Sequence, residues 1–164
     1  MQLLCVLSLF VALVPGPQAA APKAPAKAPA AAKAPAAKGV RTIELTGGDD
    51  MKYNLTKIEA KPGETLHVVL KSTGTIPKMA MAHNFVLLKP GTDQVEFNTA
   101  AFSARETDFI PPAMKAAVIA NTPLAGAGET VETTFKAPAA WKYALLCSFP
   151  GHFALGMRGT LTVK

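Results

Sequence analysis

The sequence predicts an all-β domain, built as an antiparallel Greek-key β-sandwich of about eight strands with one short helix between strands. Residues 65–71 alternate in hydrophobicity and place Leu66, Val68 and Leu70 on one face. Short runs of the same kind recur along the chain, and turn sequences such as 61–64 (Lys-Pro-Gly-Glu) separate them. Hydrophobic residues make up 49% of the chain, which is enough for one packed core.

The first segment, residues 1–21, is interpreted as a secretory signal peptide. The apolar run 3–14 has 12 residues, which is too short to cross a bilayer as an ordinary helix. A Pro-Gly-Pro sequence and three alanines at 19–21 follow, as at a signal peptidase site. No charged residue precedes the run, and a buried N-terminal helix is the alternative. We expect an exported protein that resides in the periplasm.

Residues 22–38 contain only Ala, Pro and Lys and are expected to form a disordered linker. This segment carries four of the chain's lysines and no acid, so residues 39–164 hold 13 basic and 11 acidic residues. The basic character of the whole chain therefore comes from the linker. The sequence has no stripe of basic residues interleaved with aromatics, so it gives no indication of nucleic-acid binding. The linker is either a passive spacer or a basic arm for peripheral association with a membrane.

Residues 39–164 are expected to form the one folded domain. A Thr-Asp start and spaced apolar residues predict a short helix within 92–105, and Pro111-Pro112 ends regular structure after it. The predicted strands are 41–46, 54–60, 65–71, 83–88, 116–121, 130–135, 141–147 and 159–164.

The chemistry lies between the last two predicted strands. Cys147, His152 and Met157 stand on one loop and offer a thiolate, an imidazole and a thioether, a soft ligand set that suits copper. A trigonal site needs a second imidazole, and only His83 and His67 remain. His83 begins a predicted strand and can face the loop, whereas His67 lies mid-strand and is interpreted as an ordinary strand residue.

Simpler interpretations of these residues remain open. A lone cysteine is usually a small buried hydrophobe, and a lone methionine usually fills a core. An exported protein that keeps one unpaired thiol exposes it to oxidation, however, and metal ligation would protect it. Zinc is the main rival metal, although a thioether is a poor zinc ligand.

The segment 147–152 (Cys-Ser-Phe-Pro-Gly-His) with Met157 and the strand after it resembles the ligand loop of azurins and auracyanins, the bacterial blue copper proteins of cupredoxin fold. The segments 51–54, 76–78, 83–87 and 118–122 also resemble azurin segments in order. The resemblance implies one type 1 copper held by His83, Cys147, His152 and Met157.

The resemblance also implies roles for residues around the metal. Asn84 would tie the two ligand-bearing segments together, and its amide and that of Phe149 would hydrogen-bond the Cys147 sulfur. Ala82 stands where azurins have a glycine whose carbonyl lies near the metal. The chain further departs from azurins in having four residues between His152 and Met157, as in auracyanins, and in lacking the N-terminal disulfide.

Such a site implies an exported monomeric electron carrier, not an enzyme, that exchanges electrons with redox proteins such as c-type cytochromes or respiratory and reductase complexes. The alternative is periplasmic copper binding and carriage without electron transfer. Family members dock through an apolar surface, although these side chains can instead pack beneath the loop. The expected docking patch consists of Met51, Ile76, Ala80, Met81, Phe149, Pro150, Phe153 and Leu155.

Overall fold

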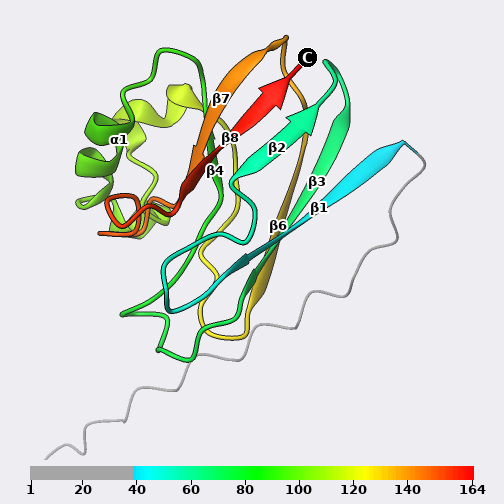
Figure 1. Ribbon diagram of the computed structural model, residues 1–164. Helices are drawn as coiled ribbons and strands as arrows, with labels where there is room; N and C mark the ends of the chain where they lie inside the picture. The colour runs from blue at the N-terminus through cyan, green and yellow to red at the C-terminus, as the bar shows by residue number, and fades with distance from the viewer. Residues whose placement is uncertain (1–38) are drawn as a thin grey trace, which may run out of the picture.

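The computed structural model describes residues 39–164, so the expected signal peptide (1–21) and linker (22–38) lie outside the described residues. Figure 1 shows two packed β-sheets with one helix beside them. The strands are β1 (Val40–Gly47), β2 (Lys57–Ala60), β3 (Thr65–Ser72), β4 (Val86–Leu88), β5 (Val118–Asn121), β6 (Thr130–Lys136), β7 (Trp141–Leu146) and β8 (Arg158–Val163). The helices are α1 (Gln94–Ala101) and two 3₁₀ helices, Arg105–Thr107 and Pro112–Ala117.

The strand order is β1-β3-β6 in one sheet and β2-β8-β7-β4-β5 in the other. The pairs β1–β3 and β2–β8 are parallel, and the other four pairs are antiparallel. The predicted eight-stranded sandwich with one α-helix is therefore confirmed, and its pairing is mainly antiparallel as expected, but the two parallel pairs were not foreseen. Strand β2, which lies between β1 and β3 in the sequence, belongs to the second sheet. β1 and β3 are therefore direct neighbours in the first sheet, and they run in the same direction.

The main core lies between the two sheets. The alternation predicted for β3 is observed, since Leu66, Val68 and Leu70 are at most 1% exposed. Leu145 of β7 and Leu161 of β8 face them from the other sheet. Burying each side chain of this size stabilises the fold by about 1.5–3 kcal/mol, so this layer fixes the ends of the strands that carry the loops.

Helix α1 covers the outer face of the five-stranded sheet. Phe97 of α1 packs in a second cluster with Val86 of β4 and Leu146 of β7, whose side chains point away from the main core. The helix begins where the Thr-Asp start predicted it, because the Asp93 carboxylate accepts hydrogen bonds from the Val95 and Glu96 amides at 2.8 and 3.0 Å. Within residues 39–164 we find no helix with the length and apolar character needed to cross a membrane.

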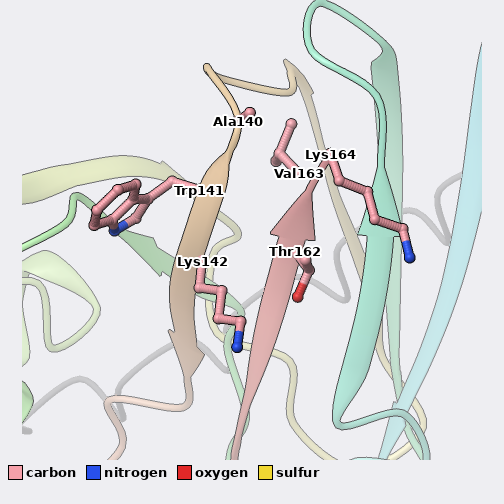
Figure 2. Close-up of a pocket in the computed structure, with 6 residues that line it drawn as sticks. All are labelled: Ala140, Trp141, Lys142, Thr162, Val163 and Lys164. Atoms are coloured by element: carbon pink, nitrogen blue, oxygen red, sulfur yellow. The ribbon is translucent and has the colours of Figure 1, made fainter.

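A surface hollow lies where β7 begins and β8 ends (Figure 2). It is lined by Ala140, Trp141, Lys142, Thr162, Val163 and Lys164. The indole of Trp141 is 63% exposed and points to the side of β7 away from β8. None of the expected site residues lines this hollow, and the loop with the candidate ligands follows the opposite end of β7.

Candidate metal centre

Three of the four expected ligands meet at one buried point. The ligand atoms of His83, Cys147 and His152 all lie within 4.8 Å of one another. The two Nδ1 atoms are 3.3 Å apart, and Cys147 Sγ lies 3.5 Å from Nδ1 of His152. Each of these residues is at most 2% exposed. The structure therefore aims two imidazole nitrogens and a sulfur at a shared position.

The segment from Cys147 to Met157, the ligand loop, is shaped by its own backbone. The Cys147 amide donates to the Met157 carbonyl at 3.0 Å, which closes the loop directly between two candidate ligands. The Met157 amide donates to the His152 carbonyl at 2.9 Å, and the His152 amide to the Phe149 carbonyl at 3.1 Å. These backbone hydrogen bonds fix the positions of Cys147, His152 and Met157 within the loop, and with them the points from which the three side chains project.

His83 reaches the site from a different part of the chain. It lies before β4 and forms an isolated bridge with Ala125, with hydrogen bonds of 2.9 and 2.7 Å in the two directions. The Tyr53 hydroxyl donates to the carbonyl of Asn84, the next residue, and so holds this segment from the other side. His83 is therefore placed independently of the ligand loop.

Asn84 connects the His83 segment to the ligand loop. Its side-chain oxygen accepts from the Ser148 amide at 2.9 Å, and its Nδ2 donates to Ser148 Oγ at 2.9 Å and to the Asp108 carbonyl at 3.0 Å. Asp108 has a φ of 53° and Phe109 one of 59°, both unusual for residues with side chains. Three segments are thus joined through one buried amide, as the resemblance implied for two of them.

Met157 lies beside His83. The residue is fully buried, and its Cε and the His83 Cγ approach the same point above Gly47 at the end of β1. Ala82, which precedes His83, is also fully buried. The side chain of Met157 therefore lies next to His83, on the side of the group where the fourth ligand was expected.

Burial sets the protonation of these side chains. It lowers the pKa of His152 to about 4, with repulsion from His83 as a smaller cause. Burial also lowers the pKa of His83, although Asp49 and Asp50 oppose this effect. Both imidazoles are consequently neutral at pH 7, which is the form that binds a metal.

The thiol behaves in the opposite way. Burial raises the pKa of Cys147 to about 12, while hydrogen bonds from the backbone of Asn84 and Phe149 lower it somewhat. These two amides are the ones expected to bond the sulfur. At pH 7 the thiol therefore keeps its proton, which a metal must displace on binding.

The group of ligands fits one small metal ion. Two nitrogens at about 2.0 Å from an ion in a trigonal plane lie about 3.5 Å apart, and a sulfur at about 2.3 Å lies about 3.7 Å from each nitrogen. The observed separations of 3.3 and 3.5 Å are close to these values. Two imidazoles, one thiolate and one thioether form the donor set that suits copper.

His67, the histidine that we did not place in the site, lies elsewhere. It stands in β3, where its ring contacts Thr134 Oγ1 at 2.9 Å and the Glu132 carboxylate at 3.2 Å across the pair with β6. The structure therefore brings His83, and not His67, to Cys147 and His152.

The residues of the expected docking patch differ in exposure. Ile76, Ala80 and Leu155 are exposed, whereas Met51, Met81, Pro150 and Phe153 are half-buried. Phe149 does not fit the surface role, because it is only 8% exposed. Its ring packs edge-on against Phe109 with centroids 5.1 Å apart and lies 4.8 Å from the His152 ring, so it packs beneath the ligand loop.

The segment that carries Ile76 and Ala80 is held at its start and in its middle. Asp49 accepts from the Thr75 amide at 2.9 Å and from its hydroxyl at 3.0 Å. Lys78 pairs with Glu129 at 2.7 Å. Its apolar residues are therefore presented on a fixed backbone and not on a loose loop.

Several residues of the site were missed by sequence reasoning. Met79 is 79% exposed in the same segment as Ile76, so it belongs to the exposed apolar surface. Its place in the sequence, between Lys78 and Ala80, the latter a residue of the expected docking patch, was the signal that could have identified it. Lys52 donates through Nζ to the Leu155 carbonyl in the ligand loop, a contact across 103 positions that no local pattern reveals. Gly47 likewise reaches the site from the end of β1.

Comparisons with known proteins agree with this geometry. Residues 41–164 match the model of the copper binding proteins of the plastocyanin/azurin family. Auracyanin-A of Chloroflexus aurantiacus is 35% identical over 128 residues, which cover 77% of this chain and 76% of that protein. Azurin of Pseudomonas aeruginosa is 35% identical over 127 residues, covering 75% and 84%.

Solved structures give the same result. The structure of auracyanin A from Chloroflexus aurantiacus, described as a "blue" copper protein, has a TM-score of 0.69 at 35% identity and covers 77% of this chain and all of its own. Reduced auracyanin from Roseiflexus castenholzii has a TM-score of 0.67 at 35% identity, covering 75% and 96%. With its ligand group of two imidazoles, thiolate and thioether, the chain belongs to the plastocyanin/azurin family of copper-binding proteins and is a blue copper protein of cupredoxin fold.

Proposed function

We propose that this protein shuttles single electrons between redox partners through a type 1 copper held by His83, Cys147, His152 and Met157. One observation carries the proposal: all four side chains are at most 2% exposed and converge from two hydrogen-bonded backbone segments. All four candidate ligands are buried protein side chains, so the donor set itself reserves no position for a substrate. The same observation favours a carrier over an enzyme.

The rigidity of the site supports fast transfer. Copper, when bound, supplies a one-electron couple between Cu(I) and Cu(II). Asn84 holds the ligand loop and the His83 segment in a fixed relation through its bonds to Ser148. Because the ligands are held in place before and after transfer, little energy is needed to rearrange them, and the hydrogen bonds to the Cys147 sulfur adjust the potential.

The exposed apolar residues near the ligand loop supply the docking surface in this proposal. Leu155 is 52% exposed within the loop, and Ile76 and Met79 are exposed in the segment that leads to His83. Phe102 of the α1 C-terminus is 59% exposed beside a shallow cleft that Phe153 also lines. An apolar surface of this kind suits brief contact with redox proteins such as c-type cytochromes or respiratory and reductase complexes.

The proposal places this activity outside the cytoplasm. The apolar run at 3–14 and the small residues after it support export to the periplasm, and the Ala/Pro/Lys segment 22–38 supports a spacer that can approach an anionic surface. An exported free thiol is consistent with a metal ligand, since Cys147 is the one free cysteine among the described residues.

The optical spectrum of the copper-loaded protein tests the proposal. We expect an intense thiolate-to-Cu(II) band in the red, which Cys147→Ser removes without unfolding the sandwich, because a hydroxyl cannot replace the soft thiolate. The reduced protein should return electrons to an oxidised cytochrome c while retaining its copper. If copper instead passes readily to a chelator and electron exchange is slow, the protein carries copper ions and the proposal is wrong.

A further inference from the structure

The end of strand β1 forms a wall of the metal centre. A Cβ atom added to Gly47, the last residue of β1, would lie 2.6 Å from Cε of Met157 and 3.0 Å from Cγ of His83. Two of the four ligand side chains therefore lie directly against this one residue. Neither the ligand loop nor the His83 segment includes it.

Space, and not backbone conformation, explains the glycine here. Gly47 is not among the glycines with positive φ, so its backbone adopts a conformation open to any residue. The ligand-loop glycines Gly151 and Gly156, by contrast, have φ values of 86° and 95°. What distinguishes Gly47 is that a methyl group would occupy the position of the Met157 side chain.

The backbone of Gly47 cannot easily retreat. The residue pairs with Ser72 of β3 and forms a bridge with Tyr53. Its carbonyl accepts the Thr73 amide at 2.8 Å and the Thr73 hydroxyl at 3.3 Å. A larger residue at this position must therefore displace its neighbours and not the strand.

Of the two neighbours, Met157 is the one that would move. Carbon atoms in contact lie about 3.5–4.0 Å apart, so Cε must shift by about 1 Å, whereas the His83 ring must shift by only about half as much. The His83 backbone is held through both its N–H and its C=O, which bond to Ala125. Methionine has three rotatable side-chain bonds and adapts readily.

We propose that Gly47 is a positioning residue for the axial ligand: the absence of a side chain there lets the Met157 methyl rest on β1, and this contact fixes where the thioether sulfur lies. The inference rests on the proposed role of Met157 as a copper ligand. Cys147 and His152 are not among the nearest neighbours of a Cβ at Gly47, so a change there should act mainly on Met157, with a smaller displacement of the His83 ring.

The test is a double-substitution cycle in the full chain, with Gly47→Ala, Met157→Leu and the double variant. Gly48→Ala is the matched control, because a Cβ at Gly48 would meet only the side-chain oxygens of Asp50 and Thr73, each at 3.2 Å. We expect Gly47→Ala to raise the reduction potential towards that of Met157→Leu and to alter the thiolate-to-Cu(II) spectrum. Added to the Met157→Leu variant, the same substitution should shift the potential much less, since only the small displacement of His83 remains, and Gly48→Ala should leave the potential unchanged.

A copper-free measurement separates this inference from the proposed function. In the metal-free protein, Gly47→Ala should lower the midpoint of thermal unfolding more than Gly48→Ala does. The loss should be smaller when Gly47→Ala is added to the Met157→Leu variant, since the shorter leucine side chain has no atom at the position of the methionine Cε. Two results would overturn the inference. One is an equal fall in the unfolding midpoint for Gly47→Ala and Gly48→Ala. The other is a shift in reduction potential on Gly47→Ala that is the same with Met or Leu at position 157. A missing blue band in the unsubstituted protein would overturn the proposed function and leave the contact test valid.

Discussion

Acid should destabilise the metal-free protein through His152. Burial lowers the pKa of its imidazole from 6.5 to about 4 in the folded chain. Above pH 6.5 neither state carries the proton, so His152 adds no pH dependence there. Between pH 6.5 and about 4 the unfolded chain takes up a proton that the folded chain refuses, and the free energy of unfolding must fall. At about 1.36 kcal/mol for each pH unit, the full loss is roughly 3 kcal/mol.

Urea unfolding of the metal-free chain at pH 7, 6, 5 and 4 measures this loss. The variant His152→Gln is the control, because it removes the titrating group and keeps a polar side chain of similar reach. We expect its free energy of unfolding to fall by roughly 3 kcal/mol less than that of the unsubstituted chain between pH 7 and 4. Parallel curves for the two proteins would refute the reasoning, since other acid-sensitive groups such as Glu64 contribute equally to both.

Three further predictions concern the ligand loop. Voltammetry should give the highest reduction potential for Met157→Leu, an intermediate one for the unsubstituted protein and the lowest for Met157→Gln. The reason is that a thioether favours Cu(I) and an amide oxygen favours Cu(II). Equal potentials would mean that Met157 is not a ligand. Chemical unfolding of Asn84→Ala should show a loss of about 2–4 kcal/mol, because buried partners such as the Ser148 amide lose their bonds; a loss below about 1 kcal/mol would contradict this. Lys52→Met should cost less than about 1 kcal/mol yet speed copper removal by a chelator, since the Leu155 carbonyl loses its donor; an unchanged rate would argue against the clamp.

The fold could be predicted because its strands carry local signals. Alternation marked β3, and the Thr-Asp start marked α1. Boundaries were less accurate where tertiary contacts decide them. The strand expected at 83–88 begins only at Val86, because His83 pairs with Ala125 outside the sheet ladder. The parallel pairs were missed because strand direction depends on which sheet each strand enters.

The ligand group could be predicted because three of its members lie within 11 residues and their chemistry is distinctive. The environment of those ligands could not be read in the same way. Phe149 was expected at the surface but packs against Phe109, a residue 40 positions away whose φ of 59° is set by the folded chain. Nothing in the sequence indicated the role of Gly47. A glycine that is required because a side chain would clash cannot be told apart, in sequence, from a glycine that is required by a turn.

The direction of β1 gives the domain a polarity with practical use. Gly47 touches the metal centre, and Val40 lies seven residues back along an extended strand, about 23 Å away. β8 runs from the ligand loop to Val163 and on to Lys164, so this end also lies far from the metal. A support, label or fusion attached next to Val40 or at Lys164 would thus lie away from the ligand loop. An electrode film built in this way would hold the protein with its metal site facing the solution.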